Sequence, residues 1–188
     1  MDTRYKSVLL CNDDRHQFSG EQDMYIRMTI SGLTVDPLTN SPIVILKEID
    51  GDKSLPIWIG LLEATAIASE LEGIKFSRPM THDLIDNLMK MVDVRVTKVE
   101  VCDLKDNTYY ALIHFEQGDK QLSIDARPSD ALAISLRVKA PIFVAEEIIN
   151  KSREIDLKPE AEDKSEEGKK WQKILEELNP EDFGKYKM

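Results

Sequence analysis

Two segments of the sequence place an arginine and a proline directly before oxygen-bearing side chains. The runs are RPMTHD at 78–83 and RPSD at 127–130. Proline is tolerated near the start of a helix, where Thr, Ser or Asp caps free N–H groups, so plain helix starts are one interpretation. A helix N-terminus also carries a partial positive charge, and a nearby guanidinium adds a forked donor for phosphate or carboxylate. An anion site or active site is therefore the second interpretation.

His82 is the residue in these runs best suited to proton transfer. Histidine changes its charge near neutral pH, as a general acid or base working at that pH must. A structural histidine is the alternative that the spacing leaves open. His114 alternates with apolar neighbours in an expected strand and is interpreted as a packed or surface residue.

Acidic residues near the same runs offer hard oxygen ligands for Mg²⁺ or a similar ion. They are Glu63, Asp83, Asp125 and Asp130. Metal-assisted phosphodiester cleavage needs such carboxylates, a nucleophilic water and a cation on the leaving oxygen. The other interpretation makes these acids helix caps and ion-pair partners of arginine. Their convergence in space decides between the two.

These side chains need a fold that holds them, and hydrophobic periodicity predicts an α+β domain. Strands are expected at 24–35, 43–49, 55–59, 94–101, 109–116, 121–125 and 141–144. Helices are expected at 61–71, 81–91 and 129–138, with a last turn or two at 145–150. We expect a mixed, largely antiparallel sheet with three main helices in one compact domain, because antiparallel meanders are interspersed with the helices.

The 188 residues are predicted to form one domain with two extensions. Residues 1–23 are interpreted as a flexible N-terminal extension, and 24–150 as the domain. Residues 151–188 are interpreted as a charged linker with a short amphipathic helix at Trp171–Leu178, which Asn179-Pro180 ends. That helix is too short to stand alone, so it is expected to dock on its own domain or on a partner.

Composition and missing motifs exclude several classes of protein. No stretch approaches the roughly 20 apolar residues of a membrane helix, and the first residues lack the apolar segment of a secretory signal, so we expect a cytoplasmic protein without a membrane partner. Phosphate-loop, dinucleotide-binding, zinc-protease and serine-hydrolase motifs are all missing. The formal net charge of −10 disfavours a broad basic face for nucleic acid, but it leaves room for a local phosphate site.

Five blocks in order resemble the bifunctional nuclease domain family, also known as domain of unknown function 151. They are LPIWIG at 55–60, RPMTHDL at 78–84, DLKDNTYY at 103–110, DARPSDA at 125–131 and APIFVA at 140–145. The resemblance covers roughly residues 24–150, and the ending at 180–188 is similar to that of bacterial members. It implies a compact α+β domain that self-associates, often as a dimer, and nuclease activity on DNA and RNA.

The nuclease hypothesis gives these residues roles in metal-assisted cleavage of DNA or RNA, with single-stranded nucleic acid as a possible partner. The catalytic candidates are His82, Asp83, Asp125 and Asp130. The substrate-binding candidates are Arg78, Thr81, Arg127 and Ser129. The candidate ligands for Mg²⁺ or Mn²⁺ are Asp83, Asp125, Asp130 and Glu63.

A second hypothesis is a non-enzymatic oligomeric module. In this interpretation the arginine-proline helix starts bind a small anionic ligand, and the C-terminal helix recruits a protein partner. Trp58, between two apolar residues at the end of a strand, is expected to pack in the core, with a ligand platform or a subunit contact as the alternatives.

Overall fold

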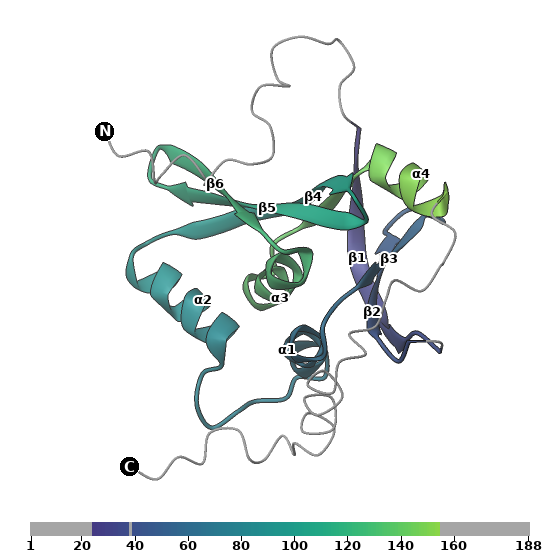
Figure 1. Cartoon of the computed structure of the whole chain (residues 1–188). Coiled ribbons are helices and arrows are strands. Elements are labelled where there is room, and N and C mark those ends of the chain that lie inside the picture. The colour runs from purple at the N-terminus through teal and green to yellow at the C-terminus, as the bar shows by residue number, and fades with distance from the viewer. Residues whose placement is uncertain (1–23, 38, 155–188) are drawn as a thin grey trace.

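The computed structural model describes residues 24–37 and 39–154, and within them the chain forms a seven-stranded sheet and four helices (Figure 1). The elements in chain order are β1 (Tyr25–Val35), β2 (Pro42–Glu48), β3 (Ser54–Trp58), α1 (Leu61–Leu71), α2 (Thr81–Met91), β4 (Arg95–Lys105), β5 (Thr108–Gln117), β6 (Lys120–Ala126), α3 (Pro128–Val138), β7 (Ile142–Ala145) and α4 (Glu146–Glu154). The extension expected at 1–23 lies outside the described residues. Of the extension expected at 151–188, residues 151–154 belong to α4, and the rest, including the helix at Trp171–Leu178, lies outside the described residues.

The sheet has the strand order β3-β2-β1-β7-β4-β5-β6. All neighbouring strands are antiparallel except β4 and β7, which are parallel. The predicted α+β fold with a mixed, largely antiparallel sheet is therefore confirmed. Pro56 lies in β3, an edge strand, where a residue without an N–H donor is tolerated.

The short strand β7 joins the two halves of the sheet. Val144 pairs with Ile26 of β1 on one side and with Val101 of β4 on the other. Both Val144 and Val101 have 0% exposed surface. A strand buried between two neighbours and under a helix needs apolar side chains in succession, as the sequence IFVA provides.

Helix α3 is central to the packing of the helical layer. Its residues 131–134 are all buried, with Leu132 and Ala133 in one apolar cluster and Ala131 and Ile134 in the other. The helix lies against β4 and β5, and it contacts both α1 and α2 (Figure 1). Burial on several sides fixes α3, and α3 in turn fixes the first turns of its two neighbours.

Helices α2 and α3 start differently from the expected capping pattern. Their N-cap residues are Met80 and Arg127, and none of Thr81, Ser129 and Asp130 occupies the N-cap position. Instead, the backbone N–H of Met80 donates to Asp83 Oδ2 at 2.9 Å. Pro128 is the first residue of α3, the position where a missing N–H costs least.

Helix α2 leaves a stripe of apolar side chains exposed. Leu84, Leu88 and Met91, which share one face of the helix, are 60%, 57% and 83% exposed. Met89 packs inward instead, and Ile85 lies partly buried against the same cluster.

No helix in 24–37 or 39–154 combines the length and apolar character required to cross a membrane.

Candidate functional site

The first turns of α1, α2 and α3 meet through their side chains. Each first turn carries one acidic residue, namely Glu63, Asp83 and Asp130. Arg127, at the N-cap of α3, contacts the acid of its own helix and the acid of α1, while His82 of α2 contacts Asp130. The helix starts that the sequence singled out therefore converge, and α1 joins them.

Arg127 forms the centre of this cluster. Its Nε donates to Asp130 Oδ2 at 2.7 Å and its Nη2 donates to Asp130 Oδ1 at 3.1 Å. Its Nη1 donates to Glu63 Oε1 at 2.7 Å. The side chain is nevertheless 65% exposed. Since a guanidinium has five N–H donors, Arg127 keeps donors that face solvent.

Glu63 reaches Arg127 by folding back over the start of its own helix. A Cβ at position 60 would lie 2.3 Å from Glu63 Oε2, so the side chain occupies the space that Gly60 leaves. An acid in the first turn also suits the positive end of the helix dipole. Gly60 therefore helps to place the carboxylate that holds Arg127.

His82 and Asp130 form a pair with a defined orientation. His82 Nε2 lies 3.3 Å from Asp130 Oδ1. An ionised carboxylate can only accept, so this contact places the proton on Nε2 and leaves Nδ1 of the neutral ring as the acceptor. The side chain of His82 is 13% exposed and that of Asp130 is 30% exposed.

The charged state of Asp130 follows from its neighbours. Burial by itself would raise the pKa of this carboxyl group. The hydrogen bonds from Arg127 and His82, with their charges, outweigh the burial and hold the pKa below its ordinary value. Asp130 is therefore an anion at neutral pH and can orient the imidazole of His82.

Asp83 lies beside this pair but serves another partner. Its Oδ1 accepts a hydrogen bond from Arg137 Nε at 2.5 Å. The Arg137 guanidinium, 5% exposed, also donates to the carbonyl oxygens of Ala133 at 2.9 Å and Ala66 at 3.3 Å. The predicted catalytic Asp83 is thus built into a bridge between α1, α2 and α3.

Asp125 does not join the cluster. It pairs across the strands with Leu112, whereas Ala126 pairs with Ala111 and packs under the helices. Since side chains alternate along a strand, Asp125 lies on the sheet face turned away from α3. Its Oδ1 is buried without a hydrogen-bond partner among the described residues. The geometry therefore separates it from His82.

The remaining substrate-binding candidates differ in accessibility. Arg78 and Thr81 are exposed at the approach to α2, whereas Ser129 is only 6% exposed within α3. Arg78 makes no ion pair with any residue in the described part of the chain. The Arg78 guanidinium is therefore available to an anion, whereas the buried Ser129 hydroxyl is poorly placed for that role.

The predicted metal ligands do not form one coordinating group. Within 24–37 and 39–154, no three His, Cys, Asp or Glu side chains are grouped so that they could hold a metal ion. Arg127 lies between Glu63 and Asp130, Arg137 engages Asp83, and Asp125 faces the other side of the sheet. As arranged, these four residues do not fit a shared ion.

Arg137 is the member of the site that sequence reasoning missed. It lies in the last turn of α3, ten residues beyond Arg127 and outside the arginine-proline run. The sequence did contain a signal, since Arg137 directly follows the apolar run ALAISL. A cation on a buried helix needs acidic partners or free carbonyl oxygens, so this position indicates an arginine with internal partners.

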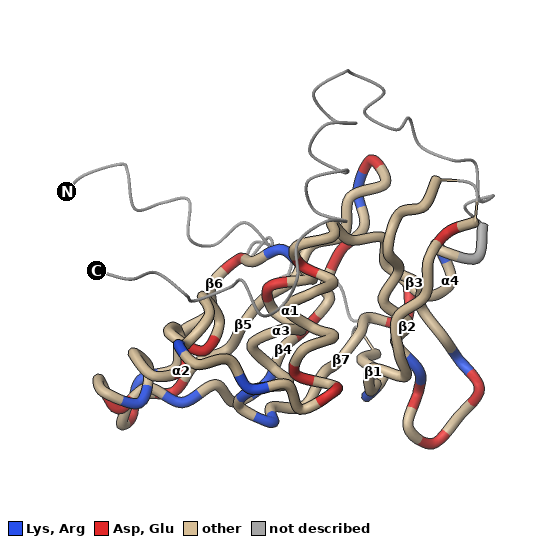
Figure 2. The backbone as a smooth tube through the Cα atoms, turned by 90° about the horizontal axis from the view of Figure 1, so that it is seen from below, with Lys and Arg blue, Asp and Glu red and all other residues tan. Residues whose placement is uncertain are grey.

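Figure 2 shows Lys and Arg interspersed with Asp and Glu along the described backbone. The positive groups relevant to phosphate are therefore local. Arg127 and Arg78 stand at helix starts, where unpaired backbone N–H groups add positive potential.

The fold and the charged cluster define an α+β domain with a histidine–aspartate pair at converging helix starts. The sequence profile of the bifunctional nuclease domain matches residues 44–156, and the chain belongs to this family. The resemblance seen in the five sequence blocks is thus confirmed.

Curated relatives include bacterial and plant proteins. An uncharacterized protein of Mycobacterium tuberculosis is 37% identical over 159 residues, covering 82% of this chain and 95% of that protein. Bifunctional nuclease 1 of Oryza sativa subsp. indica is 27% identical, and Bifunctional nuclease 2 of Arabidopsis thaliana is 29% identical, each over 105 residues. Both plant matches cover 54% of this chain but only 32% of the plant protein.

Proposed function

We propose that this protein is a nuclease, a hydrolase that cuts phosphodiester bonds of DNA, RNA or both. The observation that carries the proposal is the His82–Asp130 pair beside the exposed Arg127 guanidinium. Membership of the bifunctional nuclease domain family and the printed names of the plant relatives support it.

His82 is the proposed proton-transfer group. With Nε2–H directed at Asp130, Nδ1 can accept the proton of an attacking water as the water oxygen bonds to phosphorus. The bond from phosphorus to the leaving oxygen breaks, and that oxygen takes a proton from solvent. Asp130 is a positioning residue in this scheme, since it orients the ring and stabilises the imidazolium that forms.

Arg127 and Arg78 are the proposed phosphate contacts. Charge grows on the phosphoryl oxygens during attack, and preorganised donors stabilise it. Arg127 is held by Asp130 and Glu63, so its remaining donors are fixed in direction before substrate binds. Arg78 is exposed and has no acidic partner in the described ranges, so it can move onto the phosphate.

Dependence on Mg²⁺ or Mn²⁺ stays a prediction. Magnesium sites commonly use only one or two carboxylates together with substrate phosphates, so a preformed protein cage is not a requirement. We expect the purified chain to cut single-stranded DNA or RNA, and excess EDTA to lower the rate at least about tenfold. The measurement is the initial rate on end-labelled strands, with activity restored by Mg²⁺ or Mn²⁺.

The assay has two contrary outcomes with different meanings. Cleavage that persists in EDTA would contradict the metal prediction while leaving the acid–base proposal in place. If no strand is cut with either ion present, the nuclease proposal fails. The non-enzymatic module, with an anion bound at Arg127 and Arg78, then becomes the better hypothesis.

The exposed stripe of Leu84, Leu88 and Met91 supports a homodimer formed through α2. Three large apolar side chains on successive turns rarely stay in water on a monomer. Trp58, the earlier candidate for a subunit contact, is 38% exposed and donates its indole N–H to Asp36 Oδ2 at 3.0 Å. Each of the three residues of the α2 stripe is more exposed than Trp58.

We expect Leu88→Glu to convert the dimer to a monomer in sedimentation velocity. A carboxylate at the centre of an apolar contact would have to lose its hydration without gaining a partner. Lys90→Gln, on the same helix at a 69% exposed position, is the matched control and should leave the mass distribution unchanged. A wild-type monomer at micromolar concentration would rule out this interface.

A further inference from the structure

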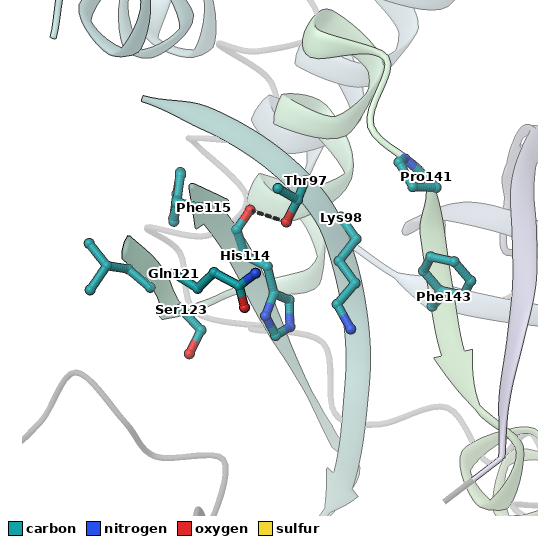
Figure 3. A pocket seen from close by; sticks show the side chains of 9 residues that line it. Thr97, Lys98, His114, Phe115, Gln121, Ser123, Pro141 and Phe143 are labelled. Carbon is teal, nitrogen blue, oxygen red and sulfur yellow. Dashed lines mark hydrogen bonds between the residues drawn. The ribbon is translucent and has the colours of Figure 1, made fainter. Parts of the chain in front are cut away.

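A second polar cluster lies on the sheet face turned away from α3. Val99 and Ile113 point toward α3 and are buried there, so their strand neighbours Lys98 and His114 point to the opposite face. A pocket of about 470 Å³ opens on that face across β4, β5, β6 and β7 (Figure 3). It is separated from His82 by the sheet itself.

Glu100 organises the charged part of this cluster. Its Oε2 lies 2.6 Å from His114 Nε2, and its Oε1 is paired with the ammonium of Lys98. The Glu100 residue is only 7% exposed, whereas the Lys98 and His114 side chains are 41% and 23% exposed. A buried carboxylate therefore holds two donors whose outer sides face the pocket.

The ionisation of Glu100 supports this arrangement. Burial by itself would raise the pKa of this carboxyl group. The hydrogen bonds from His114 and Lys98 outweigh the burial and lower the pKa below its ordinary value. The pair of donors is thus anchored to a fixed negative charge at neutral pH.

The other walls of the pocket supply an aromatic ring and polar side chains without partners. Phe143 of β7 lies on one side of Lys98, and Gln121 and Ser123 of β6 lie on the far side of His114 (Figure 3). Neither the Gln121 amide nor the Ser123 hydroxyl has a side-chain hydrogen bond within the part of the chain that the structure describes. Both remain available to a ligand.

A further cation lies just beyond the ring of Phe143. Arg27 of β1 is the cross-strand partner of Phe143 and therefore shares its face of the sheet. Arg27 is exposed and pairs with no acidic residue in the described ranges. A ligand stacked on Phe143 would thus have Lys98 on one side and Arg27 on the other.

We propose that this pocket binds one nucleotide unit, with the base stacked on Phe143 and the phosphate beside Lys98 and Arg27. The volume falls in the range of small-molecule sites, which combine apolar walls with a few convergent polar groups. Stacking on an aromatic side chain is sequence-tolerant, and a glutamine amide such as that of Gln121 can read the edge of a base. The unit can come from a free mononucleotide or from one position of a single strand.

The acidic residues on the same face explain why the site takes one unit and not a long track of phosphates. The Glu100 carboxylate is already paired with Lys98 and His114, and Glu116 is paired with Arg95 at 3.1 Å. Asp125 lies further along β6 than Ser123, on the same face. These charges leave Lys98 and Arg27 as local contacts in a surface with no overall positive excess.

The test is isothermal titration calorimetry on the full chain carrying His82→Gln, so that cleavage does not consume a strand. The probes are adenosine 5′-monophosphate, a short single-stranded oligoadenylate and inorganic phosphate. We expect saturable binding of the mononucleotide or the strand, weakened about tenfold by Phe143→Leu and by Lys98→Gln. Gln121→Ala, at an exposed position that will not unfold the domain, should weaken binding severalfold.

Arg95→Gln is the matched control, because it removes a cation from the same strand at a 75% exposed position outside the pocket. It should change the dissociation constant less than about twofold. Binding of the mononucleotide identifies the free source, and binding of the strand alone identifies the strand. The proposal is overturned if neither binds, if inorganic phosphate binds as tightly as the mononucleotide, or if Phe143→Leu and Gln121→Ala both leave affinity unchanged. The proposed nuclease activity is read separately in wild type and does not depend on this outcome.

Discussion

Replacing His82 by glutamine is expected to lower the cleavage rate by about 10²- to 10⁴-fold, the usual contribution of general acid–base catalysis. Glutamine keeps a side chain of similar reach that can hydrogen-bond to Asp130, so the packing between α2 and α3 is retained. It cannot take up a proton from water at neutral pH. The measurement is kcat on single-stranded DNA and RNA under the ion conditions that support wild-type cleavage.

Two companion variants separate chemistry from folding. Asp130→Asn leaves His82 in place but removes the anion that orients it, so kcat should fall. Because Asp130 also holds Arg127, the proposed phosphate contact, KM should rise in the same variant. Lys90→Gln, exposed on the same helix, should keep wild-type rates. Wild-type cleavage by His82→Gln would show that another site, or a contaminating enzyme, does the cutting.

Local sequence patterns were sufficient to place most of the helices and strands. Helical hydrophobic periodicity at Leu61–Leu71 and Thr81–Met91 predicted α1 and α2 with their observed ends. Gly60 and Gly73 flank the first of these segments, and Pro79 precedes the second. The position of β7 between β1 and β4 could not be predicted in this way. Pairing of Val144 with Val101 joins residues far apart in the chain, and no local pattern records that register.

The site shows the same division between local and non-local information. Residue type and helix-start position were enough to single out His82, Arg127 and Asp130. Asp125 was grouped with them, although Leu122, Ile124 and Ala126 already marked the other face of its strand. That alternation could have separated Asp125 from the helix-start residues, since neighbouring side chains in a strand lie on opposite faces of the sheet.

Non-local contact also decides whether the apolar stripe on α2 is covered. The spacing of Leu84, Leu88 and Met91 defines an apolar face, but it does not say whether the covering surface belongs to this chain. The opposite side of the helix carries His82, Ile85 and Met89 inward. Both faces of α2 thus carry apolar residues, and only the fold shows which one the domain itself covers.

Arg137→Met is expected to lower the free energy of unfolding by about 3 kcal/mol at neutral pH, the usual cost of breaking a buried ion pair that also holds carbonyl groups. Arg137 is 5% exposed and donates hydrogen bonds to Asp83, Ala66 and Ala133, so its loss removes contacts that join α1, α2 and α3. Methionine retains the apolar stem. The measurement is urea unfolding followed by circular dichroism, with Arg95→Gln, an exposed pair, expected to cost less than about 1 kcal/mol.

The pH dependence of this loss identifies its electrostatic part. Burial would raise the pKa of Asp83, but the hydrogen bonds from Arg137 and the Met80 N–H, with the arginine charge, lower it in the folded protein. A lowered folded pKa means that the contribution is fully present above the unfolded pKa, about 4, and is lost as pH falls through the folded value. The difference between wild type and Arg137→Met should therefore be largest at neutral pH and shrink below about pH 4.

The part of the difference that remains in acid reports the bonds to Ala66 and Ala133, which carry no titratable group. A difference that stays constant between neutral pH and acid would contradict a stabilising role for the Asp83 pair. Because Asp83 directly follows His82, releasing it should also loosen the first turn of α2 and lower cleavage. Arg137 would then connect the stability of the helical layer to the placement of the proposed proton-transfer group.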